Sequence, residues 1–330
     1  HGQHEFLKRI SDPLWFQAFG CVLGFDWHSS GLTTVVTGVL KRALKPDIHG
    51  MMLAGGKGSK AVNTPNDIAA ICEVFNLSDV KLNELIYTSR ISAKIDNAAL
   101  QDGYMLYHHS MLTAEDGSWA VVQQGMNPVS RMARRYHWLC DSIESFVNEP
   151  HSGIISDSTN DQTLNMTSRL SEECRKTCVD IANSNPINVI SSVQRIPIKN
   201  SLDQWFESKP ENIEAYAMPC KLDWARLRRV YDMKPRNYEE LIAIKGVGPS
   251  MVRALALVAE LIYGARPSWN DPVKFSFAHG GKDGVPFPVD RRTYDNSVKI
   301  LMDAIEGAEI ERETRLKALR RLALYLQAFS

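Results

Sequence analysis

Residues 238–264 constrain the fold of this chain most strongly, because they predict two helices joined by a very short turn. A short first helix is expected over residues 239–244. A second helix is expected from Pro249, a residue whose missing amide hydrogen costs nothing in the first helical turn. The intervening Lys245-Gly246-Val247-Gly248 contains two glycines, which adopt positive φ without steric penalty. Apolar residues then recur at helical spacing as far as Gly264, so a helical hairpin is predicted.

The core of this stretch, Ile244-Lys245-Gly246-Val247-Gly248, resembles the helix-hairpin-helix motif. Backbone N–H groups at the start of a helix point outward and can bind a phosphate. Such contacts position a protein on nucleic acid without reading its sequence. The alternative is a helical hairpin that only packs. The DNA contacts that the resemblance implies are Lys245, Gly246, Val247, Gly248 and Ser250.

The overall charge does not by itself indicate a nucleic-acid partner. The chain has 330 residues, and its 38 basic and 38 acidic side chains give no net charge. DNA binding therefore needs local basic patches. The length suits two or three domains. No apolar run is long enough to cross a bilayer, and the polar start does not look like a signal peptide. The six cysteines are scattered without a C-x-x-C pair, which favours a reduced, cytoplasmic protein.

The pattern of elements predicts an α/β (α+β) N-terminal domain over residues 1–151 and an all-α domain with the helix-hairpin-helix over residues 164–330. Residues 152–163 are polar and rich in turn formers, which indicates a linker. A β-hairpin is predicted from residues 104–113 and 118–124. The other expected elements are a strand over residues 48–53 and helices over residues 32–44, 64–75, 80–94, 130–141, 168–183 and 312–327.

The first candidate for chemistry is the run Asp26-Trp27-His28-Ser29-Ser30-Gly31, which follows an apolar segment. An acid, an imidazole and two hydroxyls beside a core form either a buried hydrogen-bond network or an active site. Both interpretations stay open at this point.

The predicted β-hairpin is the second candidate. Asp96 and Asp102 precede it, and hard cations prefer such carboxylate oxygens. His108 and His109 are expected on opposite faces of its first strand, and histidine suits a general base or a metal ligand. The alternative is a half-buried hairpin with hydrogen-bonded histidines. The catalytic candidates are Asp26, His28, Asp96, Asp102, His108 and His109. The metal candidates are Asp26, Asp96, Asp102 and His109, with Mg²⁺ or Mn²⁺ as the expected cofactor.

The order strand, strand, helix with His109, Asn127 and His137 resembles the ββα-metal nucleases, although the spacing here is longer. The resemblance implies that His109 ends a strand, that Asn127 orients it and that a helical His137 helps to hold the metal. The same predicted helix carries Arg131, Arg134 and Arg135. These arginines could clamp a phosphate or form a solvated face.

The second half also resembles helix-hairpin-helix DNA glycosylases. The segment Pro286-Phe287-Pro288-Val289-Asp290 is similar to the stretch that precedes their catalytic aspartate, which places Asp290 in that role. Ser250 stands where bifunctional members carry lysine, so the resemblance implies a monofunctional enzyme. The alternative for Asp290 is a helix N-cap.

Nearly the whole chain resembles a prokaryotic family of unknown function. The resemblance is carried by the phrases GFDWHSSG, AGGKG, QDGYMLYHH, VVQQGMN, RRYHWL and FAHGGKDG. It implies structure-selective cleavage of DNA.

The predicted function is therefore a metal-dependent endonuclease that cuts non-B DNA such as bulges, flaps or junctions. Backbone contacts ignore base identity, so DNA shape would supply the selectivity. The alternatives are a monofunctional glycosylase that uses Asp290 and a non-enzymatic binder of DNA structures. DNA is the expected partner, no membrane is expected, and a homodimer is left open.

Overall fold

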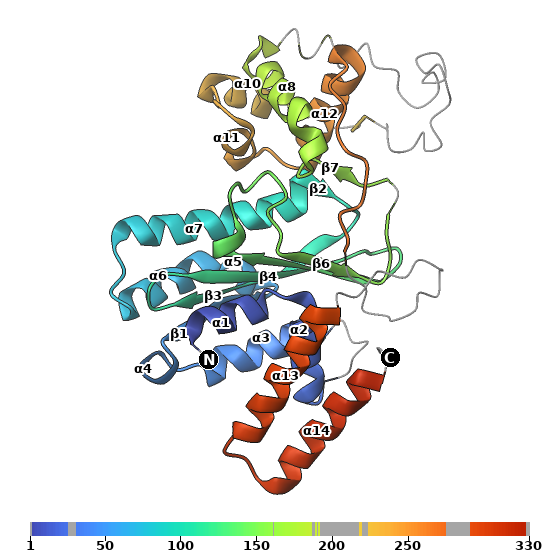
Figure 1. Cartoon of the computed structure of the whole chain (residues 1–330). Helices are drawn as coiled ribbons and strands as arrows, with labels where there is room; N and C mark the ends of the chain where they lie inside the picture. The colour runs from blue at the N-terminus through green and yellow to red at the C-terminus, as the bar shows by residue number, and fades with distance from the viewer. Residues whose placement is uncertain are drawn as a thin grey trace.

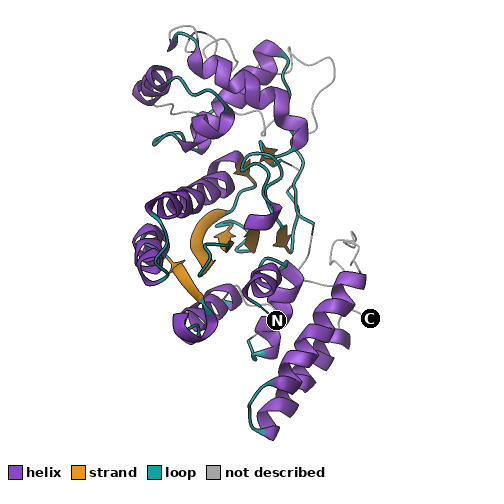
Figure 2. Ribbon diagram, turned by 60° about the vertical axis from the view of Figure 1, so that its left-hand side comes forward, coloured by secondary structure: helices purple, strands orange, loops and turns teal. Residues whose placement is uncertain are grey.

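The protein is built around an antiparallel β-sheet with helices on both faces (Figure 1). The computed structural model describes residues 2–25, 31–160, 162–186, 224–274 and 291–327, together with residues 189, 191, 218 and 219. Figure 2 shows the strands between helices on either side.

The sheet has five strands in the order β1-β3-β4-β5-β6, and every neighbouring pair is antiparallel. Leu100–Gln101 (β2) and Leu164–Asn165 (β7) form a separate two-stranded sheet. The strands of the main sheet are Met51–Lys57 (β1), Met105–Ala114 (β3), Trp119–Met126 (β4), Ala133–Leu139 (β5) and Gly153–Ser156 (β6).

One face of the sheet, called here the α2 face, packs against the N-terminal helices. Its core joins Leu7, Phe16 and Val36 of the helices to Leu53 and Val122 of the strands. The last two helices of the chain pack against α2, although they come almost 300 residues later. The helices on this side are Gln3–Ile10 (α1), Pro13–Val22 (α2), Leu32–Ala43 (α3), Arg291–Gly307 (α13) and Arg312–Gln327 (α14).

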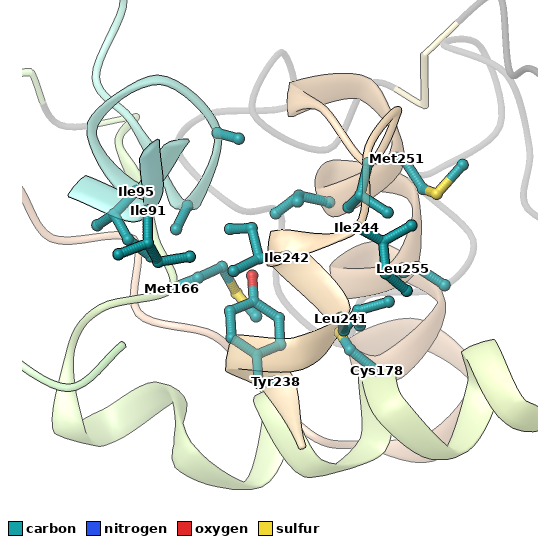
Figure 3. Packing of buried hydrophobic residues seen from close by; sticks show 14 of the residues in the cluster. Ile91, Ile95, Met166, Cys178, Tyr238, Leu241, Ile242, Ile244, Met251 and Leu255 are labelled. Carbon is teal, nitrogen blue, oxygen red and sulfur yellow. The ribbon is translucent and has the colours of Figure 1, made fainter. Parts of the chain in front are cut away.

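The opposite face, called here the α7 face, carries a larger core. Figure 3 shows Ile91 and Ile95 near Tyr238 and Ile242 in this core, with Met166 beside them. The helices of this side are Thr64–Val74 (α6), Asp79–Lys94 (α7), Glu172–Asn183 (α8), Trp224–Met233 (α10), Tyr238–Ala243 (α11) and Pro249–Tyr263 (α12). The remaining short pieces are Pro46–His49 (α4), Ser59–Val62 (α5), a π-helical turn at Ile95–Ala99 (η1) and 3₁₀ turns at Cys140–Ser142 (η2) and Arg169–Ser171 (η3).

The α/β character of the N-terminal region and the helical C-terminal part agree with the sequence-based expectation. The predicted helices at α3, α6, α7, α8 and α14 are present, as are the β3–β4 hairpin and the two helices around the Gly246 turn. Strand β1 continues through the glycine-rich run after Leu53 as far as Lys57, four residues beyond the predicted end. None of the described helices has both the length and the apolar character needed to cross a membrane.

Two predicted elements are wrong. Residues 130–141 were expected as a helix, but Ala133–Leu139 is a strand whose side chains alternate between the two faces. Residues 152–163 were expected as a linker, but they contain β6, whose four residues are all buried. In the first of these segments the polar side chains of Arg134, Arg135 and His137 form hydrogen bonds inside the protein.

The α7-face core crosses the expected domain boundary. It joins Val121 and Trp138 of the sheet to residues of α8, α11 and α12. Helices α8, α10, α11 and α12 thus lie on the α7 side, whereas α13 and α14 lie on the α2 side (Figure 1).

Candidate functional site

The turn between α11 and α12 exposes the start of a long helix. Gly246 has a φ of +102°, which a residue with a side chain adopts only with strain. Val247 is buried and its amide donates to the Ile244 carbonyl (3.1 Å), which closes the turn. Lys245, Pro249 and Ser250 are exposed. The short turn between two helices is therefore present as predicted, with positive φ at Gly246 but not at Gly248.

The turn is fastened to the end of α7. Lys94 Nζ donates to the Ile244 carbonyl (2.6 Å), and Gln101 Nε2 donates to the Pro249 carbonyl (2.8 Å). Gln101 Oε1 in turn accepts from Arg253 Nε (2.9 Å). These bonds come from residues about 150 positions earlier, so the orientation of the turn is set by the sheet region.

Several backbone N–H groups of the turn are left without a partner. Among the described residues, the backbone N–H groups of Gly246, Gly248 and Ser250 form no hydrogen bond. A Cβ added to Gly248 would meet no atom within 4 Å, so the backbone there is open to a ligand. Exposed cations lie nearby, since Arg226 Cδ is 3.2 Å from the place of a Cβ on Gly246. The exposed arginines of α10 are Arg226, Arg228 and Arg229.

Arg134 lies on the α7 face and is fully buried. Its guanidinium binds Asp102 (2.8 Å) and Asp271 (2.7 Å) and stacks over the Tyr104 ring at 4.4 Å. The Tyr136 hydroxyl donates to the same Asp102 carboxylate (2.7 Å). Burial raises the pKa of Asp102, and the charge of Arg134 opposes that rise. This cluster ties the chain after α12 to the sheet.

Arg135 lies on the opposite face and is also buried. It donates to His137 Nε2 (2.7 Å), Gln17 Oε1 (3.1 Å) and the Pro13 carbonyl (3.0 Å). Burial lowers the pKa of Arg135 to about 9. The predicted basic helix face is therefore wrong, because consecutive residues of a strand point to opposite faces. Of the three arginines only Arg131 is exposed, in the turn between β4 and β5.

A second network on the α7 face holds Asp96 and His109. Asp96 Oδ2 accepts from Gln123 Nε2 (2.6 Å) and Trp138 Nε1 (3.0 Å), and its Oδ1 pairs with His151 Nε2 (2.5 Å). His109 bonds Gln123 through Nδ1 (3.0 Å) and Ser89 through Nε2 (2.8 Å). The sequence analysis missed Ser89, Gln123, Trp138 and His151. Only the hairpin register, which pairs His109 with Gln123, could have suggested one of them.

The expected Mg²⁺ or Mn²⁺ ligands do not converge. Asp96, Asp102 and His109 are buried, and internal donors or acceptors engage all three. Within the described ranges, no group of three or more His, Cys, Asp or Glu side chains could hold an ion. These three residues therefore do not fit a divalent metal site. The fourth proposed ligand, Asp26, lies outside the described residues, as do the catalytic candidates His28 and Asp290.

The ββα arrangement is also not formed. His137 lies on strand β5 and donates through Nδ1 to the Ile10 carbonyl (2.9 Å), on the α2 face. His109 lies on the α7 face. Asn127 accepts from the amides of Val129 and Ser130 through its side-chain oxygen, so it shapes the β4–β5 turn. The three residues therefore share no site.

His108 occupies a different environment on the α2 face. It stands opposite Lys57 of β1 and Gln124 of β4 in the sheet register. The register shifts between Leu106 and His108, and such a bulge can redirect a side chain. The Tyr107 hydroxyl accepts from Gln124 Nε2 (2.5 Å) beside the imidazole. His108 Nε2 lies 3.1 Å from Thr37 Oγ1 of α3, and both histidines of β3 are buried because helices cover both faces.

Comparison with known proteins gives a family without a stated activity. The family described as "Protein of unknown function (DUF763)" matches residues 1–289. The chain belongs to this family. The expected resemblance to a family of unknown function is confirmed, and the matched region ends just before α13. No curated protein and no solved structure matches the chain. Any function must therefore be argued from this family member's own residues.

Proposed function

We propose that this DUF763 protein is a structure-selective DNA endonuclease that holds its substrate by the phosphate backbone at the α11–α12 turn, in the manner of a helix-hairpin-helix. The observation that carries the proposal is that the N–H groups of Gly246, Gly248 and Ser250, at the start of α12, have no hydrogen-bond partner among the described residues. A phosphate is the natural ligand of such a helix start.

The charges around the turn support a polyanionic ligand. Lys245 is exposed within the turn, and the exposed Arg226, Arg228 and Arg229 follow on α10. The chain has no net charge, so this local group of cations supplies the attraction that the whole molecule lacks. Contacts of this kind read no bases. Selectivity would therefore come from the shape and deformability of the DNA.

A requirement for Mg²⁺ or Mn²⁺ is part of the proposal. Asp96, Asp102 and His109 do not fit such a site, so no catalytic step is assigned to them. Chelation with EDTA tests the requirement directly, whichever residues hold the ion.

The test uses end-labelled duplex, bulged, flapped, branched and single-stranded DNA with the full chain. Each DNA is incubated with Mg²⁺, with Mn²⁺ and with EDTA. Strand cuts at the distorted DNAs that disappear with EDTA are the expected result. Full cutting in EDTA would overturn the metal requirement.

Two other results would replace the proposed activity. Breaks that form only after hot alkali on a damaged base would favour a monofunctional glycosylase that uses Asp290. Binding of the distorted DNAs without any product would favour a non-enzymatic DNA-structure binder.

A further inference from the structure

Helix α10 places an arginine directly on the backbone of the α11–α12 turn. Both α10 and α11 pack on α8 (Figure 1). The Cγ, Cδ and Nε atoms of Arg226 lie 3.6, 3.2 and 3.7 Å from the place of a Cβ on Gly246. A side chain at position 246 would therefore meet Arg226, in addition to the strain of a φ of +102°. The glycine thus allows the Arg226 side chain to cross the turn.

This crossing brings the Arg226 guanidinium close to the amide of Gly246. Two bonds of about 1.5 Å separate the Gly246 nitrogen from its Cβ position, so Arg226 Nε lies within about 7 Å of that nitrogen. One phosphate group can bridge such a gap by accepting a hydrogen bond of about 2.9 Å from each side. Guanidinium and backbone N–H groups are both common donors to phosphate oxygens. The turn and α10 can therefore bind the same phosphate.

Arg229 extends the cationic surface along α10. Residues three apart on a helix are neighbours, with Cβ atoms about 5–6 Å apart, so Arg229 lies beside Arg226. The buried Leu227 and Val230 define the inner side of the helix, whereas both arginines are exposed. Lys245 adds a third exposed cation within the turn. Three cations therefore lie close together on one surface.

Two of these cations have no acidic partner in the part of the chain that the structure describes. Neither Arg229 nor Lys245 forms an ion pair there. The single acidic residue of α10 is Asp232, which follows Arg228 by four positions and so lies on the side of that arginine. Like charges close together on a helix are unfavourable. A bound polyanion would balance the charges of Arg229 and Lys245.

We propose that α10 binds the DNA strand that is held at the α11–α12 turn. Arg226 shares the phosphate at Gly246, and Arg229 binds a further phosphate of the same strand. This inference rests on the proposed grip at the turn and adds to it a path for one strand. A strand carries one charge about every 3.4 Å along the helix axis, so neighbouring cations of α10 can reach different phosphates of it.

The path along α10 also defines the kind of DNA that satisfies it. Both contacts lie on one strand, so a complementary strand is not needed for either of them. Flaps and bulges present such an unpaired strand next to duplex DNA. Single-stranded DNA should consequently depend on the same two arginines as duplex DNA does.

The test measures DNA binding of the full chain by fluorescence anisotropy in EDTA, so that cutting of the DNA does not affect the result. The affinities for a labelled duplex and a labelled single strand are determined at salt concentrations between about 50 and 200 mM. The slope of log affinity against log salt concentration reports the number of phosphates that the protein neutralises, at about 0.9 for each duplex phosphate and about 0.7 for each single-strand phosphate.

Three substitutions are compared with wild type. Arg226→Gln and Arg229→Gln each remove one cation of the proposed path. Arg228→Gln is the matched control, because Arg228 is equally exposed but lies about 160° from Arg226 around the helix. Circular dichroism shows whether each variant is folded. Arg226→Lys is a further variant that keeps the charge at the turn without the planar guanidinium.

The expected result is a loss of about 0.9 from the duplex slope and about 0.7 from the single-strand slope for Arg226→Gln and for Arg229→Gln. Arg226→Lys should keep the wild-type slope, and Arg228→Gln should keep both slope and affinity. An equal loss in Arg228→Gln would indicate a general effect of charge and would overturn the contact with α10. A loss with the duplex alone would overturn the path of one strand.

The experiment also separates this inference from the proposed grip at the turn. If Ser250→Glu weakens DNA binding while Arg226→Gln and Arg229→Gln keep the wild-type slopes, the contact with α10 is overturned and the grip stands. A wild-type protein that binds neither DNA would overturn both.

Discussion

Arg134 and Arg135 are neighbours in sequence but contribute to different halves of the protein. Arg134 joins Asp102 and Asp271 on the α7 face, whereas Arg135 joins α2 to the sheet on the α2 face. A sequence with adjacent arginines suggests an exposed basic surface. Here the two arginines lie on one strand, whose consecutive side chains point to opposite faces of the sheet. Each guanidinium therefore forms its hydrogen bonds inside the protein.

Arg134→Gln should destabilise the protein strongly. The change leaves two buried carboxylates next to each other without their cation, and such a loss typically costs about 3–5 kcal/mol. The free energy of unfolding from urea titration measures the effect. Arg131→Gln is the matched control, since Arg131 is exposed three residues earlier, and it should stay within about 0.5 kcal/mol of wild type. A similar small effect of both substitutions would contradict the role of Arg134.

Acid should destabilise the protein through its buried histidines. The pKa of His108 falls from the ordinary 6.5 to about 4 in the folded protein, because of burial. The unfolded chain therefore binds one more proton between these two pH values, and stability falls as the pH is lowered through this window. His108 contributes up to about 1.4 kcal/mol per pH unit to the slope of the free energy of unfolding against pH.

The measurement is urea unfolding at several pH values between 7 and 4.5. The free energy of unfolding of His108→Gln should depend less steeply on pH than that of wild type, by the contribution of one bound proton. The stabilities of the two proteins should therefore converge as the pH falls. Burial also lowers the pKa of His109 and His137, so part of the slope should persist in the variant. Parallel curves for the two proteins would show that His108 titrates normally.

At the scale of elements, the sequence predicted what local signals determine. The Pro249 start and Gly264 end of α12 and the β3–β4 hairpin all follow from short local sequence patterns. Strand β5 was missed because both of its faces carry polar residues, so the alternation of apolar and polar side chains is absent. The partners that satisfy Arg134, Arg135 and His137 come from residues up to 137 positions away, which no local pattern reveals.

The candidate site was predictable only in part. The sequence singled out His108 by residue type, but its contact with Thr37 of α3 and its place opposite Lys57 follow only from the fold. Asp96 and Asp102 attracted the same attention, yet tertiary contacts make them internal hydrogen-bond acceptors. The residue type alone suggests candidates for a functional site. A candidate is excluded when the fold buries its side chain and internal partners take up its hydrogen bonds.

The start of α12 offers a test that separates folding from DNA binding. Ser250→Glu puts a negative charge in the first turn of the helix, which should stabilise α12 by about 0.3–1 kcal/mol. The same charge competes with a phosphate for the amides of the turn. DNA affinity should therefore fall by about tenfold or more, equivalent to about 1.4 kcal/mol.

Fluorescence anisotropy with a labelled duplex at several salt concentrations measures this effect. Ala304→Glu is the charge-matched control, because Ala304 is exposed on α13 on the opposite side of the sheet. It should bind DNA like wild type. If both substitutions weakened DNA binding equally, the cause would be a general effect of charge. That result would show that the turn does not contact DNA.

At the scale of the whole molecule, the α7-face core unites segments that looked like separate domains. Trp138 and Val121 of the sheet share this core with α8, α11 and α12, and Asp271 completes the buried cluster around Arg134. The turn that we propose to bind DNA is consequently oriented by the sheet. The proposed nuclease would benefit from such a connection, because a grip on the DNA backbone would then fix the position of the reacting phosphate.

This organisation predicts opposite outcomes for two truncations. A fragment of residues 1–151 lacks β6, Asp271 and the helices that cover Trp138, so it should bind the dye ANS and show no near-ultraviolet circular dichroism. A fragment of residues 1–289 lacks only α13 and α14, which pack on α2 outside the matched family region. It should keep the near-ultraviolet spectrum and unfold cooperatively with a lower midpoint. An independently folded 1–151 fragment would show that the α7-face core is an interface between two domains and not a single core.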